Sequence, residues 1–136
     1  MGTPSITTFK DNGRTICSLY RHYDGQQNSH GLELAMILDG ILKGKHNGSG
    51  CIIAQVIAAF KKEAYNFYMV APGSHYGMYQ YTVDLKGLVG KTECTIKCTP
   101  DDSGISGLDP EGWIAKFGMP QFEIDIPEDW AGGTGY

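Results

Sequence analysis

The residues with the clearest capacity for chemistry lie in the stretch LYRHYDG, residues 19–25. Arg21, His22 and Asp24 come at the end of a β-prone run that breaks at an Asp-Gly turn. In an extended strand, the side chains of Arg21 and His22 point to opposite faces. Two interpretations are open. Either Arg21 pairs with Asp24 or Glu33 and fixes the turn, or its guanidinium binds a phosphate or carboxylate at the rim of a sheet.

A second candidate site is the loop PGSHYGMYQY, residues 72–81. It places His75, Tyr76 and Tyr79 beside the aromatic pair Phe67-Tyr68. Exposed aromatic rings beside glycine-rich backbone suit stacking on a base or another flat ring. The alternative is a tyrosine-lined hairpin that covers its own core.

The motifs of the common catalytic classes are not found in the sequence. GKHNGSG, residues 44–50, lies between two expected helices and lacks the terminal GK[ST] of a P-loop. No GxGxxG follows a strand, and no GxSxG is present. The pairs Ser29-His30 and Ser74-His75 have no visible orienting carboxylate. We therefore expect no catalytic residues and a protein that is not an enzyme.

The four cysteines, Cys17, Cys51, Cys94 and Cys98, lie in apolar segments and lack CxxC spacing. Reduced thiols that pack as small hydrophobic side chains are the favoured interpretation, ahead of a metal site shared with the scattered histidines. Cys51 begins an expected helix, where the thiol pKa is lowered and a Cys–His dyad is conceivable. A core cysteine is favoured there too, so we expect neither a metal nor a cofactor.

Length and composition describe an ordinary globular protein. The chain has 136 residues, a hydrophobic fraction of 41% and a charged fraction of 19%, which favours one domain over residues 1–136. A net charge of −4 without a basic run disfavours nucleic acid as a partner. The longest apolar run is too short to cross a membrane, and Met1–Lys10 lacks the apolar core of a signal peptide, so the cytoplasm is the expected compartment.

Hydrophobic periodicity predicts an α+β fold, an antiparallel sheet packed on two helices. The expected strands are Ser5–Lys10, Arg14–Tyr23, Asn66–Ala71, Met78–Leu85, Glu93–Thr99 and residues 122–126; the expected helices are Gly31–Leu42, Cys51–Ala64 and Pro110–Phe117. Ser29 or His30 is the expected N-cap of the first helix, and residues 24–29 are expected to be loop. The second helix is apolar nearly all round, which indicates burial on every face and a homodimer or higher oligomer. Residues 1–4 and 131–136 are expected to be loose.

Several segments together suggest a family. LYRHYDGQQNSHGLELAMIL resembles a pattern of small phage proteins, roughly YRxxDG, a short gap, then HGxELAxxL. GCIIAQVIAAFK and NFYMVAPG resemble later blocks of the same group, so the resemblance covers about residues 15–85. The sequence departs from the pattern at Gln26-Gln27, where Tyr-Pro is expected, and at residues 74–76, where a charged, Arg-containing loop is expected.

The characterised proteins that this group resembles are the phage anti-Thoeris sponges. The resemblance implies binding of a cyclic ADP-ribose isomer, an immune signal made by a bacterial TIR-domain protein, which the sponge holds without cleaving. It also implies an antiparallel sheet with two helices that build the oligomer interface. Carried over by position, Arg21 would contact a phosphate, Phe67 would contact the base, and Lys97 would be a second phosphate contact.

These observations predict a phage protein that sequesters a cyclic nucleotide signal in the host bacterial cytoplasm. The expected ligand-binding residues are Arg21, His22, Asp24, Met36, Asp39, Phe67, Tyr68, His75, Tyr76 and Lys97. One alternative is an anti-CRISPR-like inhibitor that binds a defence protein, with Asp101-Asp102 and residues 123–129 mimicking nucleic acid. The other is a phosphodiesterase that destroys the signal.

Overall fold

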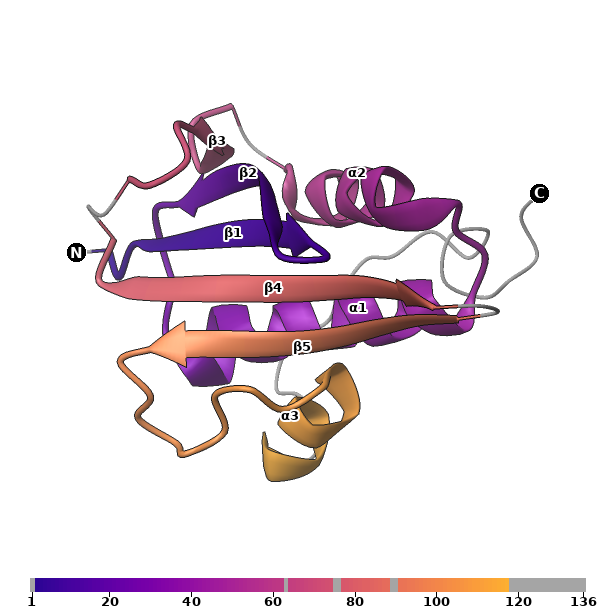
Figure 1. Cartoon of the computed structure of the whole chain (residues 1–136). Helices are drawn as coiled ribbons and strands as arrows, with labels where there is room; N and C mark the ends of the chain where they lie inside the picture. Colours follow the sequence, from indigo (N-terminus) through magenta and orange to yellow (C-terminus); the bar gives the residue numbers. More distant parts are fainter. Residues whose placement is uncertain (1, 63, 75–76, 89–90, 118–136) are drawn as a thin grey trace.

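The computed structural model of the chain describes residues 2–62, 64–74, 77–88 and 91–117 (Figure 1). These residues form a five-stranded sheet, three α-helices and one π-helical turn, so the predicted α+β class is confirmed. The elements are β1 (Ser5–Asp11), β2 (Arg14–Arg21), the π-helical turn η1 (Gln27–Gly31), α1 (Leu32–Lys43), α2 (Gly48–Phe60), β3 (Phe67–Val70), β4 (Tyr79–Leu88), β5 (Lys91–Thr99) and α3 (Pro110–Phe117). Within the described ranges, no helix has the length and apolar character needed to cross a bilayer.

The sheet has the strand order β3-β2-β1-β4-β5, with the N-terminal strand in the middle. β1 pairs with β2, β2 with β3 and β4 with β5 in antiparallel fashion, whereas β1 and β4 run parallel. The sheet is therefore mixed and not purely antiparallel as expected. After β2 the chain builds both long helices and returns as β3 at the outer edge of β2. It then crosses to the other side of β1, where β4 runs parallel to it.

A tight turn joins β1 to β2, as the Asp-Asn-Gly sequence predicts. Asn12 has φ 51° and Gly13 has φ 87°, the left-handed conformation that both central residues of a type I′ hairpin turn adopt. The register shifts between Phe9 and Lys10, so a β-bulge accompanies the turn.

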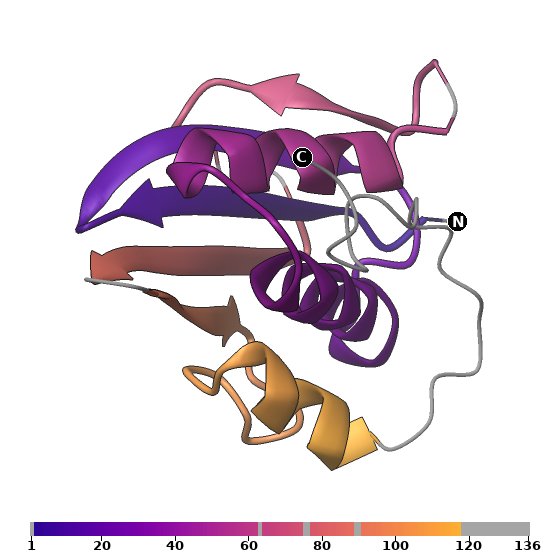
Figure 2. The same cartoon turned by 90° about the vertical axis from the view of Figure 1, so that its right-hand side faces the viewer.

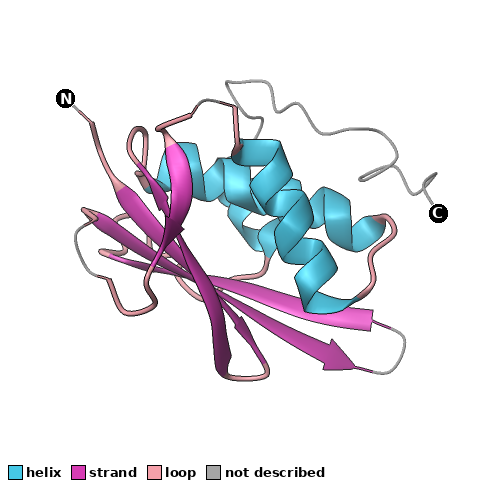
Figure 3. Ribbon diagram, turned by 90° about the horizontal axis from the view of Figure 1, so that it is seen from above, coloured by secondary structure: helices cyan, strands magenta, loops and turns pink. Residues whose placement is uncertain are grey.

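The helices α1 and α2 cover one face of the sheet, and α3 lies beside α1 at the β5 edge (Figures 2 and 3). Alternate residues of each strand point toward the helices and build the core. The largest fully buried side chains are Trp113, Tyr81, Phe9, Ile6, Leu19, Leu34, Ile37, Leu38, Ile41, Ile52, Leu85 and Ile96. Cys17, Cys94 and Cys98 are buried free thiols, in agreement with the expectation of small hydrophobic cysteines.

The second helix differs from its prediction in both position and exposure. α2 begins at Gly48, inside the segment expected to be a connector, and ends at Phe60 instead of Ala64. Lys61 is extended, and its ammonium donates to the carbonyl of Phe67, which ties the helix end to β3. Ala54 and Ala58 are exposed, so α2 is not buried on every face of the single chain.

The start of the first helix also differs. Residues 27–31, placed in or next to a loop by the sequence, form η1, and α1 continues directly from it. His30 is not an N-cap; its side chain is buried at 1% exposure. The expected short helix Pro110–Phe117 is confirmed, and Asp109 caps it by accepting a hydrogen bond from the Gly112 amide at 2.9 Å.

Several predictions fall on residues outside the described ranges. They concern His75, Tyr76, the expected strand at 122–126, the acidic residues 123–129 and the C-terminal residues 131–136. At the other end, Thr3 and Pro4 were expected to be loose. Their carbonyls accept backbone hydrogen bonds from Gly25 and from Met78 and Tyr79.

Candidate functional site

The candidate site is built around Arg21, the last residue of β2. Arg21 pairs in register with Phe67, the first residue of β3, so the residues that the resemblance assigns to the phosphate and the base lie side by side. Because side chains alternate along a strand, Arg21 points to the helix-covered face with Leu19, while Tyr20 and His22 point to the other face.

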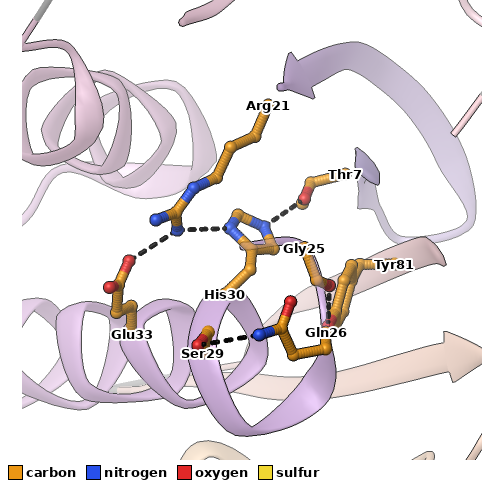
Figure 4. Close-up of polar contacts among 8 residues, drawn as sticks. All are labelled: Thr7, Arg21, Gly25, Gln26, Ser29, His30, Glu33 and Tyr81. Atoms are coloured by element: carbon orange, nitrogen blue, oxygen red, sulfur yellow. Dashed lines mark hydrogen bonds and ion pairs between the residues drawn. The ribbon is translucent and has the colours of Figure 1, made fainter. Parts of the chain in front are cut away.

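A polar cluster fixes the Arg21 side chain (Figure 4). Its Nη1 donates to Oε1 of Glu33 at 2.5 Å and to Nδ1 of His30 at 3.2 Å. The guanidinium carbon also lies 5.4 Å from the ring centre of Phe60, within the range of a cation–π contact. We call Thr7, Arg21, His30, Glu33 and Phe60 the Arg21 cluster.

His30 is the buried centre of this cluster. Its Nε2 lies 2.7 Å from Oγ1 of Thr7, and its ring lies between Phe60 and Tyr81, with centroid distances of 5.0 and 4.9 Å. Burial, reinforced by the positive charge of Arg21, holds the pKa of His30 well below its ordinary value. A guanidinium can only donate, so Nδ1 must accept and the neutral ring carries its proton on Nε2, which donates to Thr7.

The turn between β2 and η1 is held so that His30 reaches this position. Asp24 adopts φ 58°, and its carbonyl accepts the His30 amide at 3.0 Å. The Tyr81 hydroxyl donates to the carbonyl of Gly25 at 2.6 Å (Figure 4). A Cβ on Gly25 would lie 2.5 Å from the carbonyl oxygen of Thr3, so only glycine fits there. Asp24 thus acts through its backbone, and its exposed side chain is not part of the Arg21 cluster.

Phe67 contacts the Arg21 cluster through the ring of Phe60. It stacks on Phe60 with ring centres 5.1 Å apart and an interplanar angle of 25°. Phe67 is only 3% exposed, whereas Phe60 is half-buried. A planar ligand arriving at this site therefore meets Phe60 before Phe67.

His22 and Tyr68 belong to the opposite face of the sheet. The hydroxyl of Tyr20 and Nδ1 of His22 are 2.8 Å apart, and the rings of Tyr20 and Tyr68 are 5.1 Å apart. Tyr68 is 46% exposed, so this aromatic group presents a surface to solvent. The structure thus divides the strand-end residues between two faces.

The remaining predicted residues lie apart from Arg21. Lys97 points to the face without helices, where its ammonium lies 3.3 Å from a carboxylate oxygen of Asp84. Met36 is one helical turn beyond Glu33 on α1. Asp39 lies a further turn along and accepts a hydrogen bond from Lys43 at 3.1 Å.

The thiols and phenols of the core are poorly suited to nucleophilic chemistry. Burial raises the pKa of both Cys94 and Cys98 to about 12 and raises that of Cys17, so these thiols stay protonated. Burial also raises the pKa of Tyr81 far above its ordinary value. Within the described ranges, no three His, Cys, Asp or Glu side chains gather as metal ligands would.

Sequence reasoning missed three members of the Arg21 cluster. Thr7 and Phe60 come from distant elements, and only the fold brings them to Arg21. His30 carried a usable signal, because it lies nine positions after Arg21 at the start of a helix whose third residue is Glu33. The sequence named Asp24 and Glu33 as possible partners of Arg21 in the interpretation in which Arg21 fixes the turn, and the structure shows the ion pair with Glu33. The contact of Arg21 with a ligand stays a prediction.

Comparison of the chain with protein-family models, with curated proteins and with solved structures finds no match.

Proposed function

We propose that the chain is a phage anti-defence protein that binds and sequesters a cyclic nucleotide immune signal, such as a cyclic ADP-ribose isomer, without cleaving it. The proposal rests on the resemblance of residues 15–85 to the anti-Thoeris sponges and on the Arg21 cluster. The proposed partners are this small molecule and further copies of the chain, in the host cytoplasm.

The observation that carries the proposal concerns the hydrogen-bond donors of the Arg21 guanidinium. A guanidinium has five N–H donors, and both hydrogen bonds of Arg21 start from Nη1. Among the described residues, Nη2 and Nε have no hydrogen-bond partner, although the side chain is only 12% exposed. A guanidinium that is held rigidly, partly desolvated and still has donors is suited to a phosphate group.

The aromatic pair beside Arg21 supports a ligand that carries a flat ring. The half-buried Phe60 lies under the guanidinium and is backed by Phe67. Arg21, His30 and Phe67 already lie against the ring of Phe60, so a base would meet its half-exposed edge. We therefore assign to Phe60 an edge contact with the base, with Phe67 supporting the ring.

The protonation states of His30 and the buried thiols favour binding of the nucleotide over its cleavage. In the Arg21 cluster, the neutral His30 already uses Nδ1 to accept and Nε2 to donate. The buried thiols are protonated at neutral pH because burial raises their pKa. A site with these properties binds an anion rigidly but offers no activated nucleophile from the groups described.

The test is depletion of the ligand followed by its recovery. The purified protein is incubated with cyclic ADP-ribose isomers and cyclic oligonucleotides and removed by filtration. It is then heat-denatured, and both fractions are analysed by liquid chromatography and mass spectrometry. We expect one nucleotide to be depleted and then recovered intact. Recovery of an altered nucleotide would instead identify a phosphodiesterase, and no depletion would refute the proposal.

The matched variant is Arg21→Met/Glu33→Leu, because replacing both members of a partly buried ion pair by apolar residues leaves packing largely intact. Ligand depletion should be lost while the far-ultraviolet circular dichroism and the thermal midpoint stay near those of the wild type. Lys43→Ala removes a cation elsewhere on α1 and should leave depletion unchanged. Normal depletion by the double variant would exclude Arg21 from the site.

A further inference from the structure

A pocket of about 300 Å³ lies on the face of the sheet without helices. Alternate residues of two neighbouring strands form its floor, namely Thr8 and Lys10 of β1 and Gln80 and Thr82 of β4. Thr8 is in register with Thr82, and Thr82 is in register with Lys97, whose side chain points away from the helices. Paired residues of adjacent strands point to the same side, so these side chains share the helix-free face.

The charge of the pocket comes from Lys10, which is the one charged side chain among the described residues that line it. Within the described ranges, its ammonium has no ion-pair partner. Asp84, in register with Lys10, is paired with Lys97 at 3.3 Å. Asp11, the next residue in the chain, accepts a hydrogen bond from Ser49 of α2 at 2.9 Å. The pocket therefore presents one positive charge that the described carboxylates do not neutralise.

The polar side chains of the floor have unused hydrogen-bond donors. Nε2 of Gln80 is buried and has no hydrogen-bond partner among the described residues. The hydroxyl oxygens of Thr8 and Ser18 are 2.8 Å apart, and a bond between two hydroxyls uses only one of their two hydrogens. The hydroxyl of Thr82 also lacks a partner in the described part of the chain. A buried donor without a partner costs free energy, so a ligand that brings oxygen acceptors is favoured here.

We propose that this pocket binds a small sugar phosphate, with Lys10 on the phosphate and with Gln80 and the threonine hydroxyls on the sugar. A lysine ammonium is a compact charge suited to phosphate, and threonine hydroxyls both donate to and accept from sugar hydroxyls. Tyr81 lines the pocket too, but its ring belongs to the core and offers no surface for stacking a base. Residues 72–74 also line the pocket, so the ligand would lie between the sheet and this loop. The site is on the opposite face from Arg21 and does not depend on the function proposed above.

Titration of the full chain with ribose 5-phosphate, followed by nuclear magnetic resonance, tests the proposal. We expect saturable shifts of the Gln80 side-chain amide and of the backbone amides of Thr8 and Gly73. Ribose and inorganic phosphate each carry one part of the ligand. Each should bind at least about tenfold more weakly than ribose 5-phosphate, because each lacks the hydrogen bonds of the other part.

Three variants separate the contributions of the side chains. Lys10→Gln should weaken the binding of ribose 5-phosphate at least about tenfold, because a charge-assisted hydrogen bond is lost. Lys86→Gln removes the same charge from a residue of β4 outside the pocket and should leave the binding unchanged. Gln80→Leu should weaken binding without lowering the thermal midpoint, since the amide that it removes has no partner in the free protein.

Three results would overturn the proposal. The first is the absence of a saturable shift of the Gln80 side-chain amide at millimolar ribose 5-phosphate. The second is binding that Lys10→Gln does not weaken. The third is binding of inorganic phosphate as tight as that of ribose 5-phosphate, which would mean that the pocket recognises an anion alone. Because these signals come from the face opposite Arg21, the result is independent of the nucleotide-depletion assay.

Discussion

At the scale of the residue, His30 connects the sheet to the candidate site. It receives a hydrogen bond from Arg21 of β2 and gives one to Thr7 of β1, while Glu33 of α1 shares the same guanidinium. With Tyr81 of β4 protonated, the charged groups facing the ring are Arg21 and Glu33. Protonation of His30 would place a second cation beside Arg21 and take away the acceptor that Nδ1 provides.

The stability of the protein should therefore fall in mild acid. Because the pKa of His30 is lowered in the folded state, the unfolded chain binds a proton there that the folded chain does not. The stabilising contribution is present above the ordinary value of 6.5 and is lost as the pH falls below it. We expect the free energy of unfolding to decrease by about 1.4 kcal/mol per pH unit more in the wild type than in His30→Gln between pH 6 and 5. Urea titrations at half-unit steps measure this slope, and parallel slopes would contradict it.

The sequence allowed a contact to be predicted where the two residues lie close together in the chain. Arg21 and its partner Glu33 lie twelve positions apart across one turn, so their pairing could be proposed from type and spacing. Phe60 could not be predicted, because its contact with Arg21 depends on where α2 ends relative to β2. Lys97 was grouped with Arg21, but strand alternation and pairing put them on opposite faces.

At the scale of the element, η1 connects the sheet to the helices. Gln27 in this turn donates to Asp101 and accepts from the Ser103 amide, both at 2.9 Å, which fastens the loop after β5. Gly31 at its end lies against Trp113 of α3, which is fully buried and donates to the carbonyl of Ile96. One short turn thus sets the positions of His30, the 100–107 loop and α3.

Gly31→Ala should destabilise the contact of η1 with α3, although the backbone of Gly31 is helical. The new Cβ would lie 2.6 Å from Cζ3 of Trp113, and overpacking of this kind costs about 1–3 kcal/mol. Gly50→Ala is the matched control, because nothing lies within 4 Å of its Cβ position and alanine favours a helix. Thermal unfolding should show a lower midpoint for Gly31→Ala and an equal or higher one for Gly50→Ala. A neutral Gly31→Ala would show that Trp113 can move aside.

Element types were more predictable than their limits and pairing. The hairpin signal at Asn12-Gly13 and the capped helix beginning at Pro110 are local and were both found. The parallel contact of β1 with β4 was missed because a strand pattern carries no information about the direction of its neighbour. The start of α2 was missed because Gly48 and Gly50 have low helix propensity, which the burial of Ile52 and Ile53 overrides.

At the scale of the whole molecule, the outer surface of α2 is the expected contact between copies of the chain. Ala54 and Ala58 are exposed one turn apart, and Ile57 beside them is half-buried. Small side chains allow close approach of a second helix, and the resemblance assigns the oligomer interface to the helices. In the single chain, the surface of α2 that the predicted oligomer interface requires is therefore exposed.

A charged substitution on that surface should separate the copies. We expect sedimentation equilibrium to give at least twice the mass of one chain for the wild type and the mass of one chain for Ala58→Arg. Lys62→Ala changes a charge near the same helix end and should keep the wild-type mass. A wild-type protein that sediments as one chain at high micromolar concentration would refute the predicted oligomer.

The central position of β1 governs when the molecule can fold during its synthesis. β1 is synthesised before the other four strands of this sheet, yet Ser5 must wait for Tyr79, 74 positions later, before both edges of β1 are paired. The hairpin of β1 with β2 and the two long helices can form earlier, but one side of the central strand stays open until β4 arrives. Closing so long a loop slows folding. The nascent chain therefore carries an unfinished sheet until β4 has been synthesised.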